Sequence, residues 1–201
     1  MTTSKNLRPE QSCEIDAPEV SENSQHGSAV APSAAEALHN LNRLYARPGF
    51  LLRRAHQISA SVFEDACRDV ELTPAQYGAM TVLHARPGLD QSSLARALGF
   101  DKVTVLRVLR VLESRHLVQR SPALDNRRSL HLALTDIGRA LLGEALPLAE
   151  RAYQRLVRPL SQKQRSQLTE LLQLMTQGLE PDARAPLVRA GAAVAMAGEH
   201  P

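Results

Sequence analysis

Arg107 and Arg110, one helical turn apart, are the residues of this chain whose chemistry is most specific. A guanidinium group is a planar fork that donates two parallel hydrogen bonds to a phosphate or to O6 and N7 of guanine. At about 100° per residue, the two arginines share a helix face with Val103 and Ser114. The opposite face is apolar and comprises Val105, Val108, Leu109 and Leu112. Within residues 98–120, the pattern therefore predicts a helix from Lys102 to about His116 with an apolar back and a basic front; an ordinary solvated surface helix is the alternative.

The residues that precede this helix predict a second, shorter helix and a tight turn. Asp90 can cap a helix over residues 91–98, Gly99 can close it, and Asp101 can cap the basic helix from Lys102 to about His116. Two helices joined in this way form a helix-turn-helix, whose second helix lies in the major groove of DNA.

The residues that follow predict a β-hairpin with a basic tip. Residues 117–120 and 130–134 have strand character, and the polar loop between them carries Arg127 and Arg128. A hairpin with arginines at its tip, directly after a helix-turn-helix, is a wing. A chance hairpin with a charged tip is the alternative.

The charge distribution favours a polyanionic partner. The whole chain has 24 Lys and Arg against 21 Asp and Glu, a formal net charge of +3. Between residues 96 and 128, however, eight basic residues stand against three acidic ones. Such a concentration of positive charge is typical of a nucleic-acid-binding surface.

Several classes of function find no support in the sequence. It offers no carboxylate pair, no nucleophile with a base and no glycine-rich phosphate loop, so we do not expect an enzyme. The two cysteines and the histidines lack zinc-site spacing, and no metal or other cofactor is expected. With neither a membrane-length apolar run nor a signal peptide, the sequence predicts a cytoplasmic protein without membrane contact.

The expected fold class is mainly α with a small β-hairpin, a winged helix-turn-helix with flanking dimerisation helices. We expect a disordered segment at 1–34, helical dimerisation regions at 35–70 and 139–180, the winged module at 71–138, and a flexible tail at 181–201. Because the flanking helices carry apolar stripes that the small module cannot cover, a two-fold homodimer is predicted. A monomeric helical cap is the alternative. Thr135 should begin a long helix that Pro147 interrupts.

Several motifs, in this order, resemble the MarR family of bacterial transcriptional regulators over roughly residues 45–178. They are Leu-Thr-Pro-Ala-Gln-Tyr at 72–77, Leu-Ala-Arg-Ala-Leu-Gly at 94–99, Asp-Lys-Val-Thr-Val at 101–105, Asp125-Asn126-Arg127 and Leu-Thr-Asp-Ile-Gly at 134–138. Two positions depart from the family pattern: Leu106 stands where Thr is common, and His116 stands where Gly is common.

The resemblance implies a homodimer that binds a palindromic operator in double-stranded DNA, usually as a repressor. It also implies release of the DNA when a small phenolic or aromatic acid binds. Residues 47–57 resemble a subgroup that controls breakdown of aromatic or N-heteroaromatic carboxylates.

The predicted DNA contacts come from three elements. The basic helix supplies base and groove contacts, the start of the preceding helix suits a phosphate, and the wing tip suits a narrow minor groove. By analogy with the family, Asp125 orients a wing arginine. The predicted contact residues are Gln91, Ser92, Ser93, Lys102, Val103, Thr104, Arg107, Arg110, Ser114, Arg127 and Arg128.

For the effector we predict a pocket between the dimerisation helices and the winged module, with Arg53, His56 and Tyr77 as its polar residues. Each also has an ordinary structural explanation. Two alternatives to ligand-controlled repression remain. Cys67 could make the protein a thiol-based redox repressor, although its place near a helix C-terminus disfavours the thiolate. The winged helix could also serve as a protein-interaction module.

Overall fold

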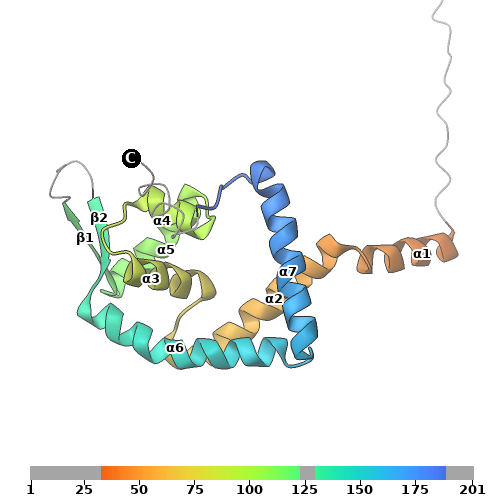
Figure 1. Ribbon diagram of the computed structural model, residues 1–201, viewed down its shortest axis with the longest axis horizontal. Coiled ribbons are helices and arrows are strands. Elements are labelled where there is room, and N and C mark those ends of the chain that lie inside the picture. The colour runs from red at the N-terminus through yellow and green to blue at the C-terminus, as the bar shows by residue number, and fades with distance from the viewer. Residues whose placement is uncertain (1–32, 123–129, 189–201) are drawn as a thin grey trace, which may run out of the picture. The chain divides into compact units, whose positions relative to one another are not determined.

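The computed structural model describes residues 33–122 and 130–188 (Figure 1). The chain divides into two units, with the boundary between residues 43 and 44. In the first unit the described residues form most of helix α1 (Ala34–Tyr45). Ser33 and Glu36 cap it reciprocally, and these hydrogen bonds lower the pKa of Glu36. Leu38 and Leu41 are exposed on one side of α1. Most of the predicted segment 1–34 lies outside the described residues.

The second unit confirms the predicted fold class. Its described residues form six α-helices, two short 3-10 helices and one antiparallel hairpin. These elements are α2 (Pro48–Ala66), η1 (Arg68–Val70), α3 (Pro74–Ala85), α4 (Gln91–Leu98), α5 (Lys102–Ser114), β1 (Val118–Pro122), β2 (Leu130–Leu134), α6 (Asp136–Val157), α7 (Gln162–Leu179) and η2 (Glu180–Asp182). The hairpin pairs Val118 with Leu134 at its base and Pro122 with Leu130 toward the loop.

Local capping chemistry sets where the helices begin. Thr73 and Gln76 form a capping box at α3, and Ser161 and Gln164 form another at α7. Single caps begin three further helices; they are Asp90 at α4, Asp101 at α5 and Thr135 at α6. Because each cap satisfies an N–H group that the helix itself cannot pair, these starts could be predicted from sequence alone.

The core lies beneath α5. Val105, Leu109 and Leu112 have no exposed surface, and Val108 packs half-buried at the edge of the cluster. Around them stand side chains from α3, α4 and β2, among them Met80, Leu83, Leu94 and Leu132. The predicted apolar back of the basic helix is thus confirmed.

Helix α6 runs from the hairpin to contact α2 (Figure 1). The predicted interruption at Pro147 is wrong, since α6 is one helix from Asp136 to Val157. Proline removes only one backbone donor, and the burial of Leu142, Ala145 and Ala152 on either side holds both halves of α6 in place. Among the described residues, no helix is both long and apolar enough to span a membrane.

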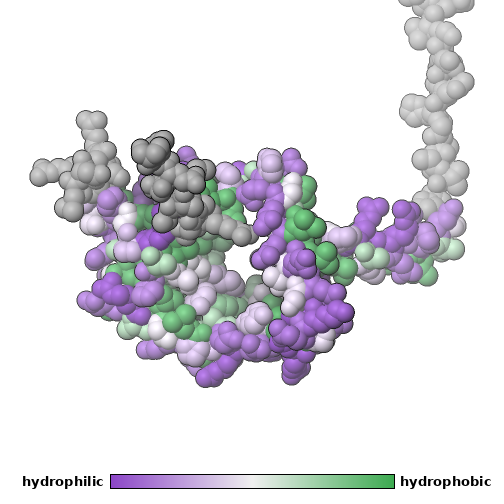
Figure 2. All heavy atoms as spheres, in the orientation of Figure 1, coloured by the Kyte–Doolittle hydropathy of each residue, from purple (hydrophilic) through white to green (hydrophobic). Residues whose placement is uncertain are grey.

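Helix α7 leaves much of its apolar surface uncovered. Leu168, Leu171 and Leu174 are 45%, 64% and 68% exposed, and Figure 2 shows hydrophobic surface over α7. After η2 the chain turns back to α4, where the Val188 N–H donates to the Arg96 carbonyl at 2.8 Å. The predicted tail therefore begins with residues that contact α4; its remainder, residues 189–201, lies outside the described residues.

Candidate nucleic-acid interface

Gly99 makes the turn between α4 and α5. Its φ of +63° is left-handed, a conformation that glycine adopts without a steric penalty. Its N–H donates to Arg96 and the N–H of Phe100 donates to Ala95, which closes α4 with a Schellman motif. Asp101 follows directly as the cap of α5, so the two helices form the predicted helix-turn-helix.

The outward face of α5 carries the predicted groove residues. Val103 is 66% exposed, and Lys102, Arg107 and Arg110 are exposed beside it. These three cations form no hydrogen bond or ion pair with any other residue that the structure describes. Their donors are therefore available to a partner, and α5 brings them together with Ser114 on one face.

Two other predicted contacts on α5 already have partners within the helix. The Thr104 hydroxyl donates to Asp101 at 2.8 Å, and the Thr104 N–H donates to the other oxygen of the same carboxylate. These hydrogen bonds hold the pKa of Asp101 below its usual value. The Ser114 hydroxyl donates to the Val111 carbonyl at 2.9 Å. Thr104 and Ser114 thus keep lone pairs for DNA, whereas their hydroxyl protons are engaged.

The start of α4 is partly occupied by its own cap. Asp90 accepts a hydrogen bond of 2.6 Å from the Ser93 N–H, which lowers the pKa of Asp90. The Ser93 hydroxyl accepts a hydrogen bond from Arg96 at 3.1 Å, whereas Ser92 is exposed. A phosphate at this position would therefore use the Ser92 hydroxyl and the other N–H groups of the first turn.

The wing is fixed to the body of the module through β2, which has backbone partners on both of its edges. On one side β2 pairs with β1; on the other, the Leu132 N–H donates to Leu89 and the Gly88 N–H donates to Leu132. Sequence reasoning missed this attachment. The predicted tip residues Arg127 and Arg128, together with Asp125, lie outside the described residues.

Two further arginines, counted from sequence only as positive charge, attach α5 to its surroundings. Arg115 donates to the carbonyls of Glu71 and Val70 at 2.6 and 3.0 Å, which ties the end of α5 to the turn after α2. Arg120 on β1 donates to the Glu113 carboxylate on α5. The alternation of β1 could have signalled this second contact, because Arg120 shares the inward face with the buried Val118.

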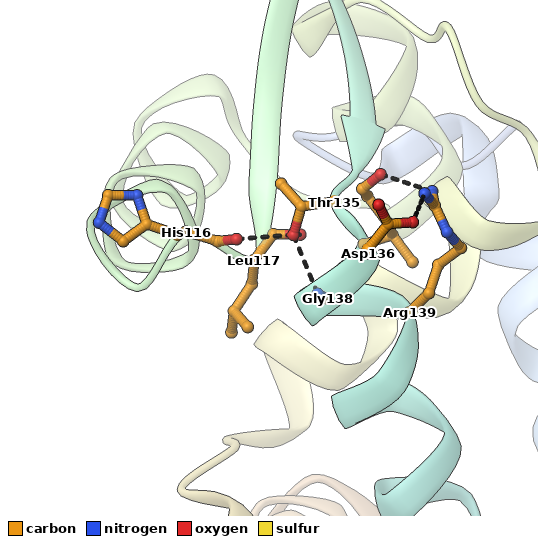
Figure 3. Close-up of polar contacts among 7 residues, drawn as sticks. His116, Leu117, Thr135, Asp136, Gly138 and Arg139 are labelled. Carbon is orange, nitrogen blue, oxygen red and sulfur yellow. Dashed lines mark hydrogen bonds and ion pairs between the residues drawn. The ribbon is translucent and has the colours of Figure 1, made fainter.

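The junction of α5, the wing and α6 is closely packed (Figure 3). His116 has a φ of +56°, and its carbonyl accepts a hydrogen bond of 2.6 Å from the Thr135 hydroxyl. Thr135 also donates its N–H to Leu117 and accepts the N–H of Gly138 at 2.9 Å. One threonine therefore caps α6 and fixes the point where β1 leaves the end of α5.

Arg53 and His56 lie on exposed turns of α2. Arg53 donates to Gln57 at 3.1 Å, and its guanidinium stands 4.9 Å from the centre of the Phe50 ring. Arg53 and His56, two of the three predicted effector residues, are therefore three positions apart on α2, and both side chains are accessible to a ligand.

Among the described residues, Tyr77 makes no ring contact or hydrogen bond with Arg53 or His56. The Tyr77 ring lies 5.3 Å from that of Phe63, and Phe63 follows His56 by seven residues, or about 10 Å along the helix axis. An open hollow of about 330 Å³ between α6 and α7 contains none of the three candidates. It is lined by Tyr153, Gln162, Arg165, Ser166, Thr169, Glu170 and Gln173.

Cys67 caps the C-terminal end of α2 and has no exposed surface. Burial raises the pKa of its thiol. Both properties oppose a role as an oxidant sensor, which requires an accessible thiolate.

Known proteins with this arrangement are regulators of transcription. The MarR family model matches residues 72–130. The transcriptional repressor NicR of Pseudomonas putida is 29% identical over 146 residues, which are 73% of this chain and 92% of NicR. The family and this relative regulate transcription, so the prediction that this chain is not an enzyme is confirmed.

Two solved structures agree in sequence and fold. The repressor CouR, bound to a 23-mer DNA duplex, is 34% identical with a TM-score of 0.63; the match covers 68% of this chain and 96% of CouR. BpsR of Bordetella bronchiseptica, whose DNA binding is regulated by 6-hydroxynicotinic acid, is 31% identical with a TM-score of 0.62. The match covers 66% of this chain and 94% of BpsR. The chain therefore belongs to the MarR family of DNA-binding transcriptional regulators.

Proposed function

We propose that this protein is a homodimeric repressor that binds a palindromic operator and releases it when a small aromatic carboxylate or phenol binds. The observation that carries the proposal is the outward face of α5, where Lys102, Arg107 and Arg110 are exposed and have no partner among the described residues. An exposed arginine pair beside an exposed valine is suited to a major groove.

The exposed cations and Val103 of this face have assigned roles in the proposal. Arg107 or Arg110 donates to guanine, Val103 contacts a thymine methyl group, and Lys102 neutralises a phosphate. Ser92 and the first turn of α4 bind a second phosphate. Arg127 and Arg128 enter the adjacent minor groove, as the position of the hairpin base after α5 suggests.

Uncovered apolar surface supports the homodimer. On α7, Leu171 and Leu174 are about two-thirds exposed, and on α6, Leu146 and Tyr153 are about half exposed. A second copy of the chain would bury these faces, and two-fold symmetry would place two α5 helices about 34 Å apart, one turn of DNA. A palindromic operator follows from that symmetry.

The effector class is supported by α2 and by a relative. BpsR has its DNA binding regulated by 6-hydroxynicotinic acid. On this chain the Arg53 cation stands over the Phe50 ring, and the His56 imidazole is exposed one turn further along α2. An aromatic carboxylate requires such an apolar surface with a cation for its charge. The effector would release DNA by binding more tightly to a spacing of the two α5 helices that does not fit the operator.

The test begins with a duplex that the wild-type protein selects from a random-sequence pool. Light scattering gives the stoichiometry, and fluorescence anisotropy gives the affinity at several salt concentrations. We expect two chains per palindromic duplex and steeply weaker binding as salt rises, because phosphate contacts release counterions. A salt-independent affinity would favour the protein-interaction alternative, and a monomer on DNA would exclude the dimer.

The same assay tests the effector. Titration with 6-hydroxynicotinic acid and with a panel of benzoates and phenols should release the duplex for at least one compound. His56→Ala should weaken the binding of that compound. The affinity of the variant for DNA in the absence of the compound should stay unchanged. If peroxide, rather than any compound of the panel, released the DNA and Cys67→Ser abolished the effect, the redox alternative would replace this proposal.

A further inference from the structure

The guanidinium group of Arg120 joins three elements of the winged helix-turn-helix, namely β1, α5 and α4. Arg120, on β1, donates through Nε to the Glu113 carboxylate on α5. Through Nη1 it donates to Oε1 of Gln91, the first residue of α4, at 3.5 Å. The side chains of Arg120 and Glu113 are only 28% and 29% exposed, so water screens their attraction less than it does for a fully exposed pair.

The second contact has a chemical consequence for Gln91. A side-chain amide has an acceptor oxygen at one end and two N–H donors at the other. Since Arg120 takes the oxygen, the NH2 group of Gln91 is left to donate elsewhere. Gln91 is half-buried at the start of α4, next to the exposed Ser92, where the helix dipole favours an anion.

We propose that Arg120 is a positioning residue for DNA binding, which orients the Gln91 amide so that its NH2 group donates to a backbone phosphate. Glu113 holds the guanidinium in place for this task. The inference rests on the proposed DNA-binding surface and adds to it a residue that contacts no DNA.

The competing role for Arg120 is a direct phosphate contact. The two roles predict opposite behaviour for Glu113. If Arg120 positions Gln91, removing the Glu113 charge loosens the guanidinium and weakens DNA binding. If Arg120 itself binds phosphate, removing that charge frees the guanidinium, and binding stays equal or becomes tighter.

The experiment compares Arg120→Ala, Glu113→Gln and the double variant on the duplex selected by the wild-type protein. We expect each single variant to weaken binding about tenfold, the typical effect of losing a charge-assisted hydrogen bond. The double variant should bind DNA with about the same affinity as the weaker-binding of the two single variants. The effects do not add, because the two residues act through one contact. The salt dependence should stay unchanged, since Gln91 carries no charge to exchange for counterions.

Gln91→Glu provides a second test in which Arg120 keeps a partner. The carboxylate retains an acceptor for the guanidinium and suits the first turn of a helix, but it has no NH2 donor. DNA binding should therefore fall, whereas thermal unfolding should stay at the wild-type temperature. Gln119→Glu is the matched control, because it adds the same charge at an exposed neighbouring position of β1; it should weaken binding clearly less.

Two results would overturn the inference. One is unchanged or tighter binding by Glu113→Gln. The other is a salt slope that falls by about one unit in Arg120→Ala, the signature of a lost phosphate contact. Arg107→Ala separates this failure from that of the proposed function: if Arg107→Ala weakens binding and these variants do not, only the role of Arg120 is wrong.

Discussion

A β-carbon added to Gly138 would lie 2.0 Å from the carbonyl oxygen of Leu117, so α6 and the start of the wing touch backbone to backbone. The same oxygen accepts the Thr135 N–H, which prevents it from moving aside. Only glycine fits at this position of the α6 first turn.

Gly138→Ala should therefore destabilise the protein by about 1–3 kcal/mol or more, the typical cost of overpacking a rigid contact. Gly143→Ala on the same helix is the matched control: nothing lies within 4 Å of its added methyl group, and it should stabilise by about 0.5–1 kcal/mol through helix propensity. Urea unfolding monitored by circular dichroism measures both. Equal effects of the two substitutions would show that the Leu117 contact is not rigid.

His116→Gly should raise stability by about 0.5–1 kcal/mol, because His116 holds a left-handed φ of +56° that costs a non-glycine residue energy. The imidazole is exposed, so little packing is lost. The midpoint of urea unfolding provides the measurement. Destabilisation instead would mean that the entropy of the unfolded glycine chain outweighs the relieved strain.

Arg107→Ala and Lys102→Ala should affect DNA binding in different ways. Loss of Arg107 should cost about 1–3 kcal/mol and relax base preference at one operator position. Loss of Lys102 should weaken all duplexes alike and lower the salt slope by about one unit. Affinity measurements on single-base variants of the selected duplex separate the two patterns. If Arg107→Ala weakened every duplex equally, its role would be phosphate binding.

Cys67 should react slowly with iodoacetamide at neutral pH, because it is buried and its pKa is raised. Folding holds this thiol protonated, so its stabilising contribution is complete below the ordinary thiol pKa. The contribution declines as the pH rises past about 8.5, where the unfolded chain begins to ionise.

Cys67→Ala should therefore lose less stability than the wild type between neutral and alkaline pH, although it begins less stable. Thermal unfolding across that range, with alkylation rates of native and denatured protein, checks both expectations. Rapid alkylation of the native thiol would contradict them.

Features governed by neighbouring residues were predictable from sequence. The caps at Thr73, Asp90 and Asp101, and the turn at Gly99, depend on contacts three or four residues apart, and all occur as predicted. Pro147 shows the limit of local rules, because burial against the rest of the module outweighs one missing backbone donor.

The contacts that join distant elements were not predictable in this way. From the sequence, Arg115 and Arg120 counted only as positive charges. In the structure, Arg115 donates to Glu71, 44 positions away, and Arg120 donates to Gln91, 29 positions away. Arg53 and Tyr77 were grouped by chemical type, and the fold places them on different helices without a direct contact among the described residues. Pairings across the chain require knowledge of which faces meet, which periodicity alone does not provide.

The hydrogen bond from Val188 to Arg96 makes residue 188 a suitable site for a probe of the helix-turn-helix. It links positions far apart in the sequence, one beyond α7 and the other in the last turn of α4. A fluorophore on residue 188 would therefore report directly on the environment of the helix-turn-helix. Truncation before residue 188 would remove this backbone donor from α4, so a shortened chain offers a test of whether the contact supports the helix-turn-helix.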